Sequence, residues 1–200
     1  MKWKDIKLAT LQNVLSAEGT SIPSDDSTRD YLAGMPYVAN EGLQMICTSK
    51  KYIVKSVDLD STMGIVVGKY RKFVMPDIAK DFFEFAGEIY YTDDAVRERT
   101  QAYYTEVNNV LVLPANFTGV FTVYYKAYPE EITSDTDDEY ELQIPPDIVA
   151  ILPLYMASQL YKEDDNGIAT SLRNEFEVAY ERLAQNNPMC TYEPMDESGW

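Results

Sequence analysis

The densest group of possible metal ligands in the sequence is the run Glu163-Asp164-Asp165-Asn166-Gly167. An EF-hand calcium loop places oxygen ligands at alternating positions, a glycine at the sixth position and a glutamate at the twelfth. Counted from Asp164, the sixth residue is Ala169, so the run does not fit. We therefore predict a bend between two helices, with Asn166 or Gly167 in a left-handed conformation and the carboxylates before the positive end of the next helix.

Two other segments contain only parts of binding motifs. The stretch from Gly64 to Tyr70 (GIVVGKY) has three residues between its glycines and a tyrosine after Lys69. A phosphate loop needs four residues there, and a Ser or Thr after the lysine. The acidic stretch 134–141 (SDTDDEYE) lacks the glycine and the register of a calcium site, which favours a solvated linker. Neither segment predicts a binding site.

Side chains suited to catalysis are few. The chain has no histidine, the most common general base and metal ligand. Cys47 and Cys190 lie far apart and suggest no disulfide framework, and Cys47 is expected on the apolar side of a helix. Two carboxylates at a fixed separation can cleave a glycosidic bond, but 33 acidic residues single out no pair. We predict no catalytic residue, no cofactor and no metal.

Three tyrosine doublets, Tyr90-Tyr91, Tyr103-Tyr104 and Tyr124-Tyr125, could form a platform on which sugars stack. Adjacent residues of a strand point to opposite faces, so each doublet more simply supplies one buried and one outward ring. We favour packing over sugar binding. Outward tyrosines would also suit a protein interface.

Helical periodicity occurs at both ends of the chain. In the N-terminal part, residues 1–50, it predicts a helix over residues 4–17 and a second helix that begins after an N-cap at Ser27. The stripe of the first helix is Leu8, Leu11 and Leu15. The stripe of the second is Tyr31, Leu32, Met35, Val38, Ala39, Leu43 and Ile46. Gly34 and Pro36 are expected to bend or divide the second helix.

Residues 51–130 have a different pattern, with strands expected between Tyr52 and Tyr128. Short segments rich in Val, Ile, Phe and Tyr are separated by turn residues such as Asp93-Asp94 and Asn108-Asn109, with no helical stretch between them. This pattern predicts an inserted antiparallel β-sandwich or barrel-like unit.

Residues 131–187 predict an acidic linker and a C-terminal helical hairpin that packs with the N-terminal helices. Pro145 and Pro146 suit the first turn of one helix, and Pro153 is expected to kink it. The stripe of the last helix is Ile168, Leu172, Phe176, Ala179 and Leu183. The expected fold class is thus α+β, a helical frame with a β unit inserted into it.

Residues 188–200 show no periodicity and contain two prolines, which predicts an extended C-terminal arm. Apolar and aromatic side chains on a polar segment are typical anchors for a partner. The candidate docking residues are Met189, Tyr192, Met195 and Trp200.

The charge of the chain argues against several functions. Its net charge is −16 and its pI is about 4.3, so it should repel phosphate backbones and bind no nucleic acid specifically. No run of 18 apolar residues could span a membrane. The first residues lack the apolar core of a signal peptide, which suggests synthesis in a reducing cytoplasm.

Residues 124–183 resemble the C-terminal part of tailed-phage head–tail connector (adaptor, or neck) proteins. The matching elements are a strand end at Tyr125–Pro129, a helix start at Leu142–Pro146, the segment Leu160–Asp164 and the pair Phe176-Glu177. Residues 30–46 (DYLAGMPYVANEGLQMI) resemble the early helix of the same class. The β unit departs from the smallest adaptors, which are nearly all helical.

The resemblance implies a virion structural protein without enzymatic activity. Such proteins form rings, commonly of about twelve copies, between the portal and the tail or a second neck protein, and DNA passes through the lumen. The alternatives are a tail or baseplate component and a carbohydrate-binding module for host recognition; a glycosidase is a more distant one.

Overall fold

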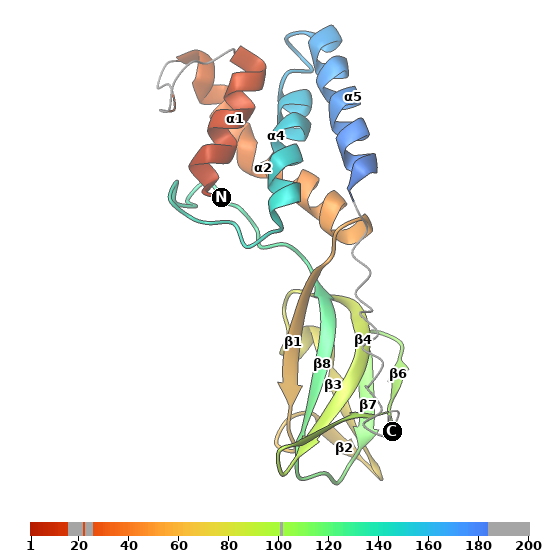
Figure 1. The fold of residues 1–200 in the computed structure, drawn as a ribbon. Coiled ribbons are helices and arrows are strands. Elements are labelled where there is room, and N and C mark those ends of the chain that lie inside the picture. Colours follow the sequence, from red (N-terminus) through yellow and green to blue (C-terminus); the bar gives the residue numbers. More distant parts are fainter. Residues whose placement is uncertain (16–21, 23–25, 101, 184–200) are drawn as a thin grey trace. The chain divides into compact units, whose positions relative to one another are not determined.

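The structure is a computed structural model that describes residues 1–15, 22, 26–100 and 102–183 (Figure 1). The chain forms two compact units. One contains Met1–Ile53 together with the chain from Tyr128 to the last helix, and it is helical. The other contains Val54–Ala127 and is built mainly of strands. The chain therefore has the predicted α+β class, with helices at both ends.

In its described part, the helical unit consists of α1 (Trp3–Leu15), α2 (Asp26–Ser49), α4 (Pro146–Leu160) and α5 (Asn166–Arg182) (Figure 1). Helix α4 is central, because it contacts α1, α2 and α5. Nine of its 15 residues are buried, as expected of a helix with apolar side chains on most of its surface. None of the helices in the described ranges has the length and hydropathy needed to cross a bilayer.

The core of the helical unit joins side chains from the two ends of the sequence. Its members include Trp3, Ile6, Leu11, Met35, Leu43, Ile46, Ile148, Leu152, Tyr155, Met156 and Phe176. Gly42 lies where α2 crosses α4, and a Cβ atom there would come 2.7 Å from Cδ1 of Tyr155. The absence of a side chain at this position permits the close approach of the two helices.

Several details of the helices differ from the predictions. Pro36 does not divide α2, which runs through it as one helix of 24 residues. Burial of the neighbouring Met35 and Ala39 against the core favours the continuous helix despite the lost backbone donor. Helix α2 begins at Asp26, so Ser27 lies in its first turn and is not its N-cap.

Of the predicted leucine stripe of α1, Leu11 is buried, whereas Leu8 and Leu15 are only half-buried. The buried face also includes Ile6, Thr10 and Val14. Thr10 is tolerated in the core because its hydroxyl donates to the Ile6 carbonyl at 2.9 Å. The stripe of α5 is confirmed at Leu172 and Phe176.

The β unit contains two four-stranded antiparallel sheets, in the orders β1-β8-β4-β5 and β2-β3-β7-β6 (Figure 1). The strands are β1 (Ile53–Leu59), β2 (Ile65–Val67), β3 (Tyr70–Val74), β4 (Phe82–Asp93), β5 (Val96–Thr100), β6 (Tyr104–Glu106), β7 (Val110–Pro114) and β8 (Val120–Ala127). Strand β8 alternates strictly, with Phe121, Val123, Tyr125 and Ala127 buried. That alternation is typical of a strand with one face on a core.

Three elements of the β unit were not expected. The stretch from Gly64 to Tyr70 is a hairpin and not one strand, because the chain turns at Gly68 with φ +61° and returns as β3. Strand β5 (VRERT) has no apolar alternation, since it is exposed and, among the described strands, lies at the edge of its sheet beside β4. The four-residue helix α3 (Met75–Ile78) interrupts the predicted all-strand pattern.

Candidate functional site

The acidic run at residues 163–167 is a bend, as predicted. It connects α4 to α5, but neither Asn166 nor Gly167 is left-handed, contrary to the expectation. Instead Asp165 caps α5, and its Oδ1 accepts from the backbone N–H groups of Gly167 (2.8 Å) and Ile168 (3.1 Å). A capping aspartate satisfies the first amides of the helix, so the left-handed residue is not needed.

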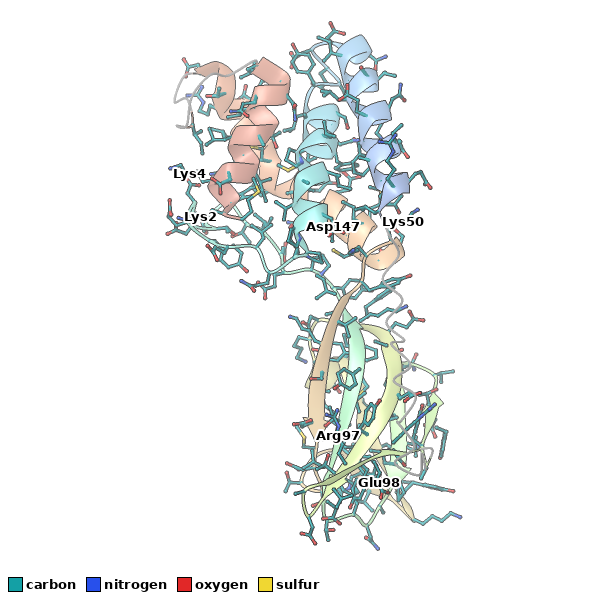
Figure 2. The ribbon with its side chains drawn as sticks, in the orientation of Figure 1. Lys2, Lys4, Lys50, Arg97, Glu98 and Asp147 are labelled. Atoms are coloured by element: carbon teal, nitrogen blue, oxygen red, sulfur yellow. The ribbon has the colours of Figure 1, made fainter. Side chains whose placement is uncertain are left out.

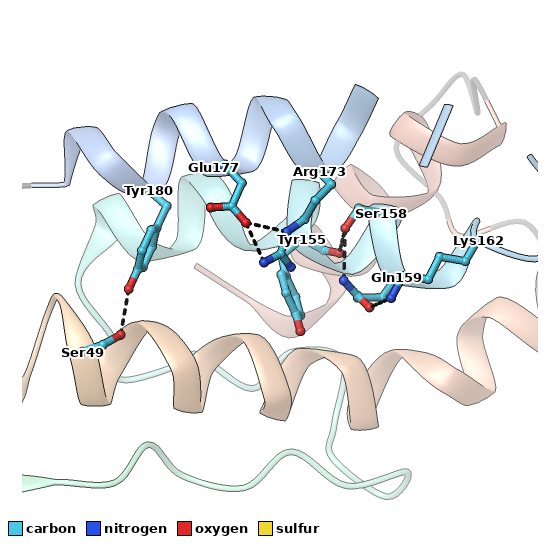
Figure 3. Close-up of polar contacts among 8 residues, drawn as sticks. All are labelled: Ser49, Tyr155, Ser158, Gln159, Lys162, Arg173, Glu177 and Tyr180. Atoms are coloured by element: carbon cyan, nitrogen blue, oxygen red, sulfur yellow. Dashed lines mark hydrogen bonds and ion pairs between the residues drawn. The ribbon is translucent and has the colours of Figure 1, made fainter. Parts of the chain in front are cut away.

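A polar cluster joins α5 to the neighbouring helices (Figure 3). The Arg173 guanidinium donates to Glu177 and lies over the rings of Tyr155 (5.2 Å) and Phe176 (5.3 Å). The hydroxyl groups of Ser49 and Tyr180 lie 2.8 Å apart and connect the end of α2 to α5. These contacts position helices, and they bring no nucleophile next to a base.

Two buried groups that could react are held protonated. Burial raises the pKa of the Tyr155 phenol to about 12, and the carboxylate of Glu41 acts in the same direction. Burial also raises the pKa of the Cys47 thiol to about 12. Cys47 lies in the helical core, as predicted, and its thiol is not a nucleophile near neutral pH.

The acidic stretch after residue 130 is fixed to α1 and is not a free linker (Figure 2). The carbonyls of Tyr140 and Asp138 accept from the amides of Trp3 (2.8 Å) and Lys4 (3.0 Å). Lys2 Nζ pairs with Glu139 at 2.5 Å, and the side chain of Lys7 pairs with Asp138. The sequence did not reveal this role because the partners are more than 130 residues apart. The stretch therefore completes the first turn of α1.

Most of the acidic excess lies in one part of the sequence. Residues 128–200 carry 17 acids and three bases, whereas residues 1–127 carry 16 acids and 14 bases. The β unit, from Val54 to Ala127, has ten acids and eight bases and is nearly neutral. Charge repulsion between two copies of the chain is therefore strongest where their C-terminal parts approach each other.

Two of the tyrosine doublets are split between faces, as predicted. On the inner face, Tyr125 is buried and the centre of the Tyr91 ring lies 4.7 Å from that of the buried Phe121. On the outer face, the rings of Tyr90 and Tyr124 meet edge-on with their centres 6.1 Å apart. The guanidinium of Arg97 lies 4.6 Å from the centre of the Tyr90 ring, so that ring already has a stacking partner. This arrangement favours packing over an open platform for sugars.

The outer side of the sheet β2-β3-β7-β6 carries exposed apolar side chains around one ion pair, Lys72–Glu106. The strand register places on it the exposed residues Ile65, Val67, Tyr70, Val74 and Tyr104, which we call the apolar sheet face. The rings of Tyr70 and Tyr104 meet edge-on at 5.7 Å across the sheet. An antiparallel sheet that faces water is usually polar on that side. The apolar sheet face therefore has the composition of a docking surface.

A depression in the β unit is lined by three aromatic side chains, by small and polar residues and by one cation, Arg71. Its guanidinium donates to the Met63 carbonyl at 2.7 Å and lies 5.9 Å from the ring of Phe117. Across the described ranges, His, Cys, Asp and Glu side chains nowhere gather in threes as metal ligands do. The predicted docking residues Met189, Tyr192, Met195 and Trp200 lie outside the described residues.

Comparison with known proteins identifies no relative: no protein-family model matches the chain, and no curated protein matches it significantly.

Proposed function

We propose that this chain is a virion structural protein, a head–tail connector subunit that forms an oligomeric ring between the portal and the tail of a tailed phage. The proposal rests on the resemblance of residues 124–183 to connector proteins. The main supporting observation is the position of the matched segments in the fold. Tyr125–Pro129 includes the end of β8, Leu142–Pro146 leads into α4, and Leu160–Asp164 includes the end of α4.

The architecture supports such a role. Ring subunits need a rigid frame and lateral surfaces that contact their neighbours. The helical unit supplies the frame, since the polar cluster and the central α4 hold α5 in place. Exposed apolar side chains on both units supply surfaces; on the helical unit these include Tyr37, Ile168 and Val178.

The charge of the chain is consistent with DNA passing through the ring. A surface with an acidic excess repels a polyanion and leaves it free to slide. The 17 acids of residues 128–200 make this part of the chain the candidate for the lumen wall. In this proposal the subunit contacts DNA without binding it specifically.

The test is to locate the chain by cryo-electron microscopy of the virion that contains it. Side-chain density in a ring between portal and tail would support the proposal and give the number of copies. Density at the distal tail would favour a tail or baseplate component. Absence from the particle would overturn the structural role.

A carbohydrate-binding module remains the alternative of a different class, because Tyr104 is exposed at the surface of the β unit. Binding of the purified chain to host glycans, lost in Tyr104→Ala, would support it. Glycan binding without any location in the neck would replace the connector proposal.

A further inference from the structure

The apolar sheet face lies on a basic segment of an acidic protein. Ile65 is 67% exposed, Val67 51% and Tyr104 44%. Of the three bases in residues 65–74 and 104–114, which form this sheet, Arg71 lies on the opposite face, so the bases near this face are Lys69 and Lys72, against one acid. Lys72 pairs with that acid, Glu106, at 2.7 Å, and Lys69 lies over the Tyr70 ring at 5.2 Å. A ligand that is both apolar and acidic would match this surface.

Residues 184–200 have this composition. They contain three acids, no base and the four apolar residues Met189, Tyr192, Met195 and Trp200. The rest of the segment is polar or small, so these side chains are the ones that would gain most from leaving water. Their chemistry complements that of the apolar sheet face.

The segment also starts close to the connection into the β unit. At the end of α5, Tyr180 meets Ser49 at 2.8 Å and Glu181 meets Lys50 at 3.3 Å (Figures 2 and 3). Ser49 ends α2, and β1 begins four residues later at Ile53. Residue 188 is five residues beyond Leu183 and Cys190 is seven, so they can lie at most roughly 17 and 24 Å from it, whereas Trp200 can lie roughly 55 Å away. The longest strand, the 12-residue β4, measures roughly 40 Å. The segment can therefore run along the sheet, with its first residues at the end near the connection and Trp200 toward the far end.

We propose that residues 188–200 dock on the apolar sheet face of the same chain, with their aromatic and Met side chains on its apolar residues and their acids near Lys69. Docking within one chain is favoured because a short tether gives an effective concentration of about millimolar. This inference does not depend on the proposed function, since it uses only the two surfaces and the place where the segment starts.

The test uses the two native cysteines. Cys47 is fully buried and Cys190 belongs to the docking segment, so a cysteine introduced on the sheet face can pair with Cys190 alone under native conditions. Val74→Cys, at the end of the sheet near the connection, should form an internal disulfide on mild oxidation, at least about tenfold faster than a non-docking position. The matched control is Val54→Cys, a 43% exposed valine near the same connection but in the other sheet. Peptide mapping should identify the link between residues 74 and 190.

Equal rates in the two variants would overturn the proposal. A disulfide between two chains, with dimers on a non-reducing gel, would also overturn it and assign the segment to a neighbouring copy. Circular dichroism of both variants establishes that they fold.

A second measurement follows Trp200 without a new cysteine. Its emission is obtained by subtracting the spectrum of Trp200→Phe from that of the natural chain, because Trp3 is the other tryptophan. Docking predicts a blue-shifted Trp200 spectrum that moves to the red in Val67→Glu. A spectrum already identical to that of the unfolded chain would contradict docking, whatever the location of the protein in a virion.

Discussion

Arg173 and Glu177 form a two-bond ion pair on α5, in which Nε and Nη2 lie 2.7 and 2.6 Å from the same carboxylate oxygen. The two residues are one helical turn apart and both are partly exposed. Such a pair contributes little by itself. The larger contribution comes from the guanidinium plane that covers Tyr155 on α4, because that contact joins two helices.

Replacing Arg173 by Lys should therefore destabilise the helical unit by about 0.5–1 kcal/mol, because the charge remains but the planar contact is lost. Glu177→Gln removes the ion pair and leaves the guanidinium on the ring, so its effect should stay below about 0.5 kcal/mol. Urea unfolding of both variants measures the difference. A larger loss of unfolding free energy in Glu177→Gln than in Arg173→Lys would show that the ion pair contributes more than the contact with Tyr155.

The raised pKa of Tyr155 predicts that the free energy of unfolding falls at high pH. Its pKa is raised from 10 to about 12 in the folded chain, so the folded state keeps a proton that the unfolded chain releases. The stabilisation is complete below pH 10 and is lost as the pH rises through the window from 10 to 12. Tyr155→Phe should show a shallower decline in the free energy of unfolding between pH 10 and 11.5.

Comparison of the two proteins at pH 8 separates this effect from packing, since the Tyr155 phenol is then protonated in both the folded and the unfolded natural chain. Tyr31 and Tyr125, whose pKa values are also raised to about 12, contribute equally to the natural chain and the variant. Identical slopes in the two proteins would show that Tyr155 is not the titrating group.

The two glycines of α2 provide a matched pair. A Cβ at Gly42 would lie 2.7 Å from the Tyr155 ring and 2.9 Å from Leu152, whereas at Gly34 it would meet only the end of Leu160 at 3.0 Å. Alanine is the better helix former by about 1 kcal/mol. Gly34→Ala should be neutral or stabilising, and Gly42→Ala should destabilise by about 1–3 kcal/mol because α2 and α4 must separate. Thermal unfolding tests the order, and equal melting temperatures would refute it.

The loop bound to α1 predicts a salt-sensitive contribution. The side chain of Lys7 is only 15% exposed where it pairs with Asp138, whereas Arg29 pairs with Asp26 in open solvent. Lys7→Met keeps most of the stem and should cost about 0.5–1 kcal/mol at low salt, and less in 1 M NaCl. Arg29→Met should change stability little at either salt concentration. Equal effects of the two substitutions would contradict a specific role for Lys7.

The sequence predicts the elements of this fold better than their edges and contacts. Strands with clear alternation, such as β8, and the stripe at Leu172 and Phe176 could be found because one face of each is buried. Strand β5 could not, because an exposed edge strand needs no apolar alternation. Ile168 was expected in the α5 stripe but is 45% exposed, since the smaller Ala169 occupies the contact.

The candidate surfaces were harder to predict than the fold. The apolar sheet face depends on the register that brings Tyr70 and Tyr104 together, and register is not visible in one sequence. The contact between residues 138–140 and α1 joins segments that are distant in the chain. The absence of histidine, in contrast, is visible in the sequence and excludes the most common general base and metal ligand from any candidate site.

The neighbouring positions of β1 and β8 in one sheet have a consequence for folding order. These are the first and last strands of the β unit and they are antiparallel neighbours, so the start of β1 and the end of β8 lie at the same end of the sheet. Once the β unit has formed, the end of α2 and the start of the segment 128–145 are held as if joined by a short loop, and the entropy of closing the loop of residues 54–127 is already spent. For the same reason, a short linker between Ile53 and Tyr128 could replace the whole insertion and leave the helical core able to assemble.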